Sequence, residues 1–125
     1  MKVAIYSRGL DTEQNAPMQF LLSELLSHKA TVFLFEPLQH QIPPTSNFST
    51  FNTYEDLVKN EVDCLISIGG DGTILDAVTL VRDSNIPILG VNFGRLGFLA
   101  SISKNEIGSA VEALEIILLL LIKEA

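Results

Sequence analysis

The stretch that decides the fold is Val62-Asp63-Cys64-Leu65-Ile66-Ser67-Ile68, which runs directly into Gly69-Gly70-Asp71-Gly72-Thr73. The first seven residues are mostly apolar, and they predict a buried strand that ends at the glycine pair. Residues 72–83 then show helical spacing, with one apolar face formed by Ile74, Ala77, Val78 and Val81. A strand, a glycine turn and a helix in this order indicate a parallel α/β sheet.

The preceding and following sequence repeats this alternation. Short β-prone runs occupy residues 3–6, 31–35 and 87–91. Between the first two runs, residues 15–29 predict a helix whose apolar face holds Met18, Leu21, Leu22, Leu25 and Leu26. Asn15 is its expected N-cap, and Pro17 suits its first turn. We therefore expect an open, mostly parallel sheet with flanking helices.

Two loops and two further helices complete this prediction. Residues 37–52 are rich in proline and polar residues and predict a long loop, followed by a short helix at 54–59. A second glycine-containing loop covers residues 92–100, and Ser103 with Glu106 forms a capping box for a last helix. Both glycine loops follow strands, so they are expected at the carboxyl edge of the sheet, where ligands bind in such folds.

Composition narrows the possible functions. The chain has 125 residues, and 8 basic against 15 acidic side chains give a net charge of −7, which disfavours nucleic acid as a partner. A single cysteine, Cys64, excludes an internal disulfide framework and a cysteine-based zinc site. No apolar run approaches the roughly 18 residues of a membrane span, and no signal peptide is evident. A cytoplasmic protein without a membrane partner is expected.

The glycine turn is the strongest candidate for chemistry. Its three glycines permit close ligand approach, and the free N–H groups of the following helix favour phosphate. Thr73 can cap this helix or donate its hydroxyl to a phosphate oxygen. Asp71 can hold a magnesium ion, accept a proton from an attacking hydroxyl, or only cap the helix. The turn contains no Lys or Arg, so phosphate charge must be met by backbone N–H groups, a metal or residues from elsewhere.

The glycine turn and a second motif together resemble the NAD kinase family. The second motif lies in Pro87-Ile88-Leu89-Gly90-Val91-Asn92-Phe93-Gly94-Arg95-Leu96-Gly97-Phe98-Leu99 and reads N-x-G-x-L-G-F-L. The glycine turn alone is shared with diacylglycerol and sphingosine kinases, whereas the second motif is much more specific. The resemblance extends to about Leu114. It implies an α/β nucleotide-binding domain over residues 1–115, and an atypical apolar tail at 116–125 where the family continues into a second, β-rich domain.

The resemblance also implies a reaction and a set of site residues. NAD kinases transfer a phosphoryl group from ATP, or in some members polyphosphate, to the 2′-hydroxyl of the adenosine ribose of NAD, with Mg²⁺ or another divalent cation. Asp71 matches the proton acceptor, and no residue is assigned as a metal ligand. Seven positions match residues of the family that contact or lie close to the nucleotides: Gly69, Gly70, Asp71, Gly72, Thr73, Phe98 and Leu99. Asn92 is a further candidate for this set. Family members form homodimers or homotetramers.

Two alternatives remain open. A diacylglycerol-type lipid kinase would share the glycine turn, but such enzymes usually follow it with an Asn-Glu pair, where this chain has Ile74-Leu75-Asp76. Many NAD kinases carry a basic residue at the position of Asp76. The second alternative is a half-domain that binds nucleotide without turning it over.

Overall fold

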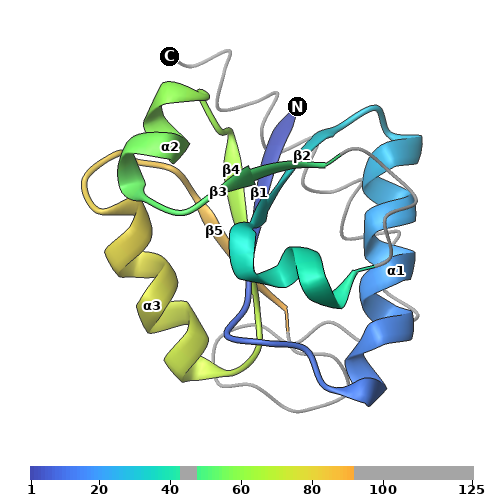
Figure 1. Ribbon diagram of the computed structural model, residues 1–125. Helices are drawn as coiled ribbons and strands as arrows, with labels where there is room; N and C mark the ends of the chain where they lie inside the picture. Colours follow the sequence, from blue (N-terminus) through green and yellow to red (C-terminus); the bar gives the residue numbers. More distant parts are fainter. Residues whose placement is uncertain (43–47, 92–125) are drawn as a thin grey trace.

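In the part of the chain that the structure describes, five parallel strands form one sheet with the order β3-β2-β1-β4-β5 (Figure 1). This computed structural model describes residues 1–42 and 48–91 of the chain. The strands are β1 (Lys2–Tyr6), β2 (Thr31–Phe35), β3 (Ser49–Phe51), β4 (Cys64–Ile68) and β5 (Ile88–Val91). The predicted open parallel α/β sheet is confirmed.

The strand order places a topological switch point between β1 and β4. From β1 the chain adds β2 and β3 on one side, and then crosses over to add β4 and β5 on the other. Tyr6 at the end of β1 lies opposite Ser67 of β4, so the two strands end side by side. In open α/β sheets the crevice beyond such a pair of strand ends is the usual ligand site.

Helices cover both faces of the sheet. Figure 1 shows α1 (Thr12–Ser27) on one side and α2 (Tyr54–Lys59) with α3 (Asp71–Val81) on the other. Each layer has its own core cluster. The first is built around Met18, Leu21, Leu22 and Leu25 of α1, and the second includes Leu57, Ala77 and Val81. The two clusters therefore cover the two faces of the sheet.

Two predicted helical faces differ from the observed ones. Leu26 of α1 is 42% exposed and Val78 of α3 is 50% exposed, whereas both were expected on the buried faces. In α3 the buried row is Thr73, Ala77 and Val81 instead. Helical spacing fixes the period of the buried stripe, but the position of the sheet decides where the centre of the stripe lies.

The predicted loop at 37–52 is partly structured. Residues Glu36–Gln41 form the 3₁₀ helix η1, and Pro37 is the second residue of this helix. Ser49–Phe51 form β3, which pairs with Phe33–Phe35 of β2 at the edge of the sheet. Three residues are too few for an alternation pattern to show in the sequence. The predictions for residues 92–100, for the last helix and for the tail at 116–125 lie outside the described residues.

Cys64 is fully buried in β4, as expected for a small apolar side chain. Burial raises the pKa of its thiol to about 12, so the thiolate is disfavoured at neutral pH. In the described part of the chain, no helix is both long and apolar enough to cross a membrane.

The N-cap of α1 is Asp11, and the predicted cap at Asn15 is wrong. The Asp11 carboxylate accepts a hydrogen bond from the Gln14 backbone N–H at 3.0 Å, and the Gln14 side chain accepts one from the Asp11 N–H at 3.0 Å. This reciprocal capping box starts the helix one turn earlier, so Pro17 lies inside α1 instead of in its first turn. A capping box depends on a pair of residues three positions apart, here Asp11 and Gln14. The prediction considered only one polar residue, Asn15, just before the apolar stripe, and so it missed the pair.

We predict that Asp11→Ala lowers the free energy of unfolding by about 0.5–2 kcal/mol, because the first turn of α1 loses its cap. Asn15→Ala is the matched control, since Asn15 is exposed within the helix, and it should change stability by less than about 0.5 kcal/mol. Urea denaturation of both variants checks this. Equal losses in the two variants would contradict the assignment of the cap.

Candidate functional site

The turn after β4 depends on Gly69. Its φ is +148°, and a Cβ built there would lie 2.4 Å from Oγ1 of Thr73. The Gly69 N–H also donates to the Val91 carbonyl at 2.9 Å, which ties the turn to the end of β5. A side chain at this position would therefore be strained and would collide with the first turn of α3.

Helix α3 begins at this turn without a side-chain cap. Gly70 is the N-cap, and its carbonyl accepts from the N–H groups of Thr73 and Ile74 at 3.1 and 3.3 Å. Within residues 1–42 and 48–91, the N–H groups of Asp71 and Gly72 have no capping acceptor. These free donors lie at the positive end of the helix dipole, an arrangement that suits an anion.

Asp71 is the first residue of α3, and its side chain is exposed at the switch point. Because Gly70 holds the cap position and no side-chain cap is formed, the alternative that Asp71 only caps the helix is wrong. Thr73 does not cap the helix either. Its side chain is buried against the Gly69 turn. The exposed carboxylate of Asp71 thus belongs to the same helix turn as the N–H groups that lack a capping acceptor among the described residues.

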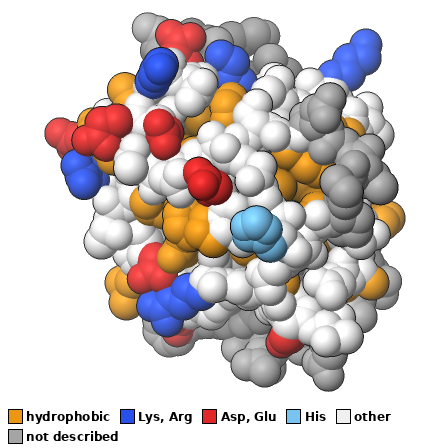
Figure 2. All heavy atoms as spheres, in the orientation of Figure 1, with side chains coloured by type: hydrophobic (Ala, Val, Ile, Leu, Met, Phe, Trp, Pro, Cys, Tyr) orange, Lys and Arg blue, Asp and Glu red, His pale blue; other side chains and the backbone are white. Residues whose placement is uncertain are grey.

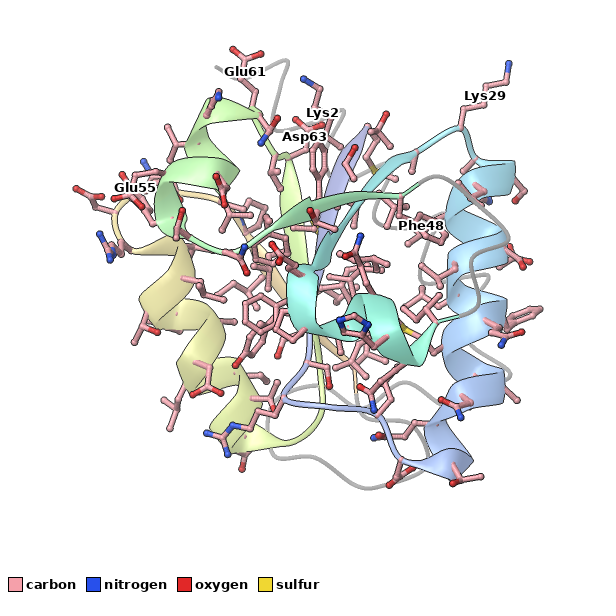
Figure 3. The ribbon with its side chains drawn as sticks, in the orientation of Figure 1. Lys2, Lys29, Phe48, Glu55, Glu61 and Asp63 are labelled. Carbon is pink, nitrogen blue, oxygen red and sulfur yellow. The ribbon has the colours of Figure 1, made fainter. Side chains whose placement is uncertain are left out.

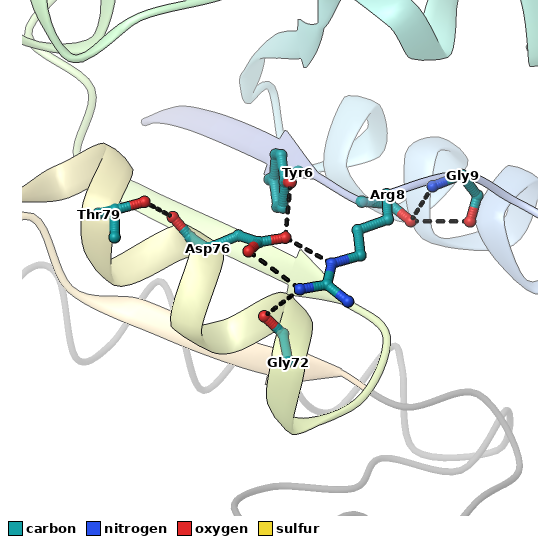
Figure 4. Close-up of polar contacts among 7 residues, drawn as sticks. Tyr6, Arg8, Gly9, Gly72, Asp76 and Thr79 are labelled. Atoms are coloured by element: carbon teal, nitrogen blue, oxygen red, sulfur yellow. Dashed lines mark hydrogen bonds and ion pairs between the residues drawn. The ribbon is translucent and has the colours of Figure 1, made fainter.

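Three residues that the sequence analysis did not assign to the site join β1 to α3 (Figure 4). Arg8 follows β1, and its Nε donates to Oδ2 of Asp76 at 2.6 Å while its Nη2 donates to Oδ1 at 3.1 Å. The Tyr6 hydroxyl donates to the same Oδ2 at 2.9 Å, and Arg8 Nη2 also donates to the Gly72 carbonyl at 3.2 Å. Arg8 could have been found from its place after the first strand, which sets it at the carboxyl edge.

The hydrogen bonds among Tyr6, Arg8 and Asp76 stabilise the charged forms of Arg8 and Asp76. The hydrogen bond to Asp76 raises the pKa of the Arg8 guanidinium. The hydrogen bonds from Arg8 and Tyr6 lower the pKa of the Asp76 carboxyl. Burial and the bond to Asp76 raise the pKa of the Tyr6 hydroxyl, whose ring packs edge-on against Phe35 with centroids 4.8 Å apart. Asp76 therefore stays ionised and holds Arg8 across the start of α3.

Other described Lys and Arg side chains belong to the opposite edge of the sheet. Figure 3 shows Lys2 close to Asp63 at this edge, with Glu61 on one side of them and Lys29 on the other, where strands β1, β2 and β4 begin. Lys59 and Arg82 end α2 and α3 and precede the next strands. Figure 2 shows acidic and basic side chains interspersed on the viewed face, without a continuous basic area among the coloured residues. Arg8 is therefore the cation available to the glycine turn within the described ranges.

No group of three or more His, Cys, Asp or Glu side chains that could hold a metal ion occurs among the described residues. Asp71 offers one carboxylate at the turn, which fits a Mg²⁺ ion that reaches the site already bound to phosphate oxygens. Of the predicted site residues, the structure brings together Gly69, Gly70, Asp71, Gly72 and Thr73. Asn92, Phe98 and Leu99 lie outside the described residues.

Comparison with known proteins gives one consistent result. The family described as ATP-NAD kinase N-terminal domain matches residues 8–116. The NAD kinase of Flavobacterium psychrophilum is 53% identical over 111 residues, which cover 86% of this chain and 37% of that protein. The NAD kinase of Cytophaga hutchinsonii is 41% identical over 101 residues, which cover 81% of this chain and 32% of that protein.

A solved structure shows the same fold. The crystal structure of yeast NADH kinase complexed with NADH superposes with a TM-score of 0.69 at 22% identity, covering 90% of this chain and 35% of that one. The chain therefore spans about a third of the length of this protein and of the two bacterial relatives.

We predict that Gly69→Ala lowers the free energy of unfolding by about 1–3 kcal/mol, because its φ and the contact with Thr73 both oppose a side chain. Gly70→Ala is the matched control, since a Cβ there meets nothing within 4 Å. Chemical denaturation of both variants checks this. The account of the turn fails if Gly69→Ala is as stable as Gly70→Ala.

We also predict an acid-dependent loss of stability through Asp76. Its pKa is lowered in the folded chain, so its contribution is present above the ordinary carboxyl pKa of 3.8 and is lost as pH falls through the lower folded value. Asp76→Asn should therefore be less stable than the parent at pH 7, and the difference should shrink toward pH 3. Urea denaturation at both pH values measures it, and a constant difference would count against the assignment.

Proposed function

Because this chain belongs to the NAD kinase family, we propose that its glycine turn is the phosphoryl-transfer site of an enzyme that converts NAD to NADP. The observation that carries this proposal is the position of Asp71. Asp71 is the first residue of α3 and lies at the switch point with an exposed side chain. The N–H groups of Asp71 and Gly72 in this first turn have no capping acceptor in the described part of the chain. A hydroxyl acceptor and a phosphate donor can meet there.

Asp71 is proposed as the general base. As the 2′-oxygen of the adenosine ribose bonds to the terminal phosphorus of the donor, its proton passes to the Asp71 carboxylate. The bond between that phosphorus and the bridging oxygen breaks, so ATP leaves as ADP. General-base assistance of this kind contributes roughly 10²–10⁴-fold. Positioning and electrostatic stabilisation of the transferring group supply the larger share.

The donor is proposed to be ATP or polyphosphate. Its terminal phosphates would lie over the N–H groups of Asp71 and Gly72, with Gly69, Gly70 and Thr73 shaping the turn below them. A divalent cation bound to the donor would neutralise phosphate charge beside Asp71. This fits the described residues, among which no group of three or more His, Cys, Asp or Glu side chains could hold a metal ion.

The NAD side of the site stays a prediction from the family. Asp71 and Gly72 are expected to contact NAD together with Asn92, Phe98 and Leu99. The name of the yeast neighbour states that it binds NADH, which agrees with a nicotinamide dinucleotide as the acceptor. The match of residues 8–116 to the NAD kinase family favours this acceptor over a lipid.

The organisation of the whole enzyme is likewise proposed. Residues 1–115 would form the α/β nucleotide-binding domain, and the family's second, β-rich domain would complete the NAD site. Residues 116–125 would lie at the point where the family continues into that domain. A homodimer or homotetramer in the cytoplasm, acting on small molecules without a membrane or nucleic-acid partner, is expected from the family.

The test uses a fusion, because the chain covers 37% of the Flavobacterium psychrophilum relative. This chain replaces the segment that it matches in that NAD kinase, and NADP formation is measured with NAD, ATP and Mg²⁺. We predict turnover by the fusion, and a fall in kcat of at least about 100-fold in Asp71→Asn, because the base is lost. Asp83→Asn is the matched control, an exposed aspartate just beyond the other end of α3 that should leave kcat unchanged.

The possible outcomes separate the competing functions. Near-normal kcat in Asp71→Asn would remove the base assignment. A fusion that phosphorylates diacylglycerol and not NAD would favour a lipid kinase. A fusion that binds NAD but forms no NADP would favour a half-domain that only binds.

A further inference from the structure

We propose that Arg8 binds a phosphoryl oxygen of the donor through its Nη1 group, and that Asp76 is the positioning residue that holds Arg8 for this task. The inference rests on the proposed function and deepens it, because it names the side chain that meets the donor's charge. The glycine turn itself carries no Lys or Arg, so that charge requires a residue from elsewhere.

The hydrogen bonds of Arg8 leave one part of its guanidinium available. Nε and Nη2 are used by Asp76 and by the Gly72 carbonyl. Among the described residues, Nη1 has no hydrogen-bond partner, and the Arg8 side chain is 61% exposed. Because a guanidinium is planar, fixing Nε and Nη2 also fixes the direction of the two Nη1 donors.

The contact between Arg8 and Gly72 shows that the Nη1 donors lie at the start of α3. A Cβ built on Gly72 would lie 3.1 Å from Nη1 and 3.3 Å from Nη2 of Arg8. The guanidinium therefore rests against the second residue of α3, in the helix turn whose Asp71 and Gly72 N–H groups have no capping acceptor among the described residues. A phosphate on these N–H groups would be within reach of Arg8, and charged arginine–phosphate hydrogen bonds are among the stronger ones.

The backbone that carries Arg8 is held on both sides. Before it, the buried Ser7 hydroxyl donates to the Gly9 carbonyl at 3.0 Å and accepts from the Gly9 N–H at 3.2 Å. After it, the Leu10 N–H donates to Gln41 Oε1 at 3.0 Å, and Gln41 Nε2 donates to the Leu10 carbonyl at 2.9 Å. A binding side chain on such a fixed loop loses little further freedom when its ligand arrives.

Charge balance explains why a held arginine suits this edge. Asp71 and Asp76 bring two negative charges close to the site, and Arg8 brings one positive charge. A polyphosphate donor would add more negative charge, so the Nη1 group of Arg8 and a donor-bound divalent cation would share its neutralisation. Asp76 secures the geometry of Arg8 and does not itself contact the donor.

The kinetic test uses the same fusion with varied ATP and varied NAD. We expect Arg8→Gln to raise the KM for ATP at least tenfold while the KM for NAD changes by less than twofold. Arg8→Lys should recover part of this loss, because it keeps the charge but not the two-point contact with Asp76. Asp76→Asn should raise the KM for ATP several-fold, since Arg8 loses its holder. Arg82→Gln, at the other end of α3, is the control and should change neither constant.

A second measurement does not depend on turnover. Isothermal titration of the 125-residue chain with Mg²⁺–tripolyphosphate should give at least fivefold weaker binding in Arg8→Gln than in the parent and in Arg82→Gln. Thermal unfolding of each variant checks that the fold is intact. This arm separates the two proposals, because a fusion without NADP formation would contradict the proposed function while the titration still tests Arg8.

Two results would overturn the inference. The first is an unchanged KM for ATP in Arg8→Gln together with lower thermal stability, which would make the Arg8–Asp76 pair a purely structural link. The second is tripolyphosphate binding that is absent in the parent, or equal in the parent and Arg8→Gln.

Discussion

The steric requirement at Gly69 is the constraint on which the rest of the site depends. Its positive φ and the 2.4 Å separation between a built Cβ and Thr73 Oγ1 mean that only glycine lets α3 start directly against the end of β4. This start leaves the N–H groups of Asp71 and Gly72 without a capping acceptor in the described part of the chain, and it sets Asp71 at the carboxyl edge of the sheet. Acceptor activation and donor binding are both proposed to follow from this one turn.

Strand order brings a second chain segment to the same place. Because β1 and β4 are neighbours, the loop after β1 lies beside the loop after β4, although they are about 60 residues apart in sequence. Arg8 and Asp76 join the two segments through an ion pair with an Nε–Oδ2 distance of 2.6 Å, and Tyr6 supports the same carboxylate. Asp76 of α3 is therefore the partner of a basic residue that follows β1.

Sequence reasoning predicted the sheet, the glycine turn and the place of that turn at the carboxyl edge, because each depends on local pattern: an apolar strand, three glycines and a helical period. It misplaced the N-cap of α1, because a reciprocal pair such as Asp11 and Gln14 is less visible than one polar residue before an apolar stripe. It missed Arg8 and Asp76 as a pair, since their contact arises only when β1 and β4 become neighbours. It also placed Val78 on the buried face, because spacing gives the period of a helix and not its rotation against the sheet.

The most direct measurement of the central claim is a map of backbone amide shifts in the 125-residue chain as Mg²⁺–ATP is added. The account predicts the largest shifts at Arg8, Asp71 and Gly72, at the switch point between β1 and β4. The chemical shifts of backbone amides at the opposite edge, such as those of Lys2 and Lys29, should not change. Shifts centred on that opposite edge, or none at millimolar nucleotide, would contradict the claim that this turn is the phosphate site.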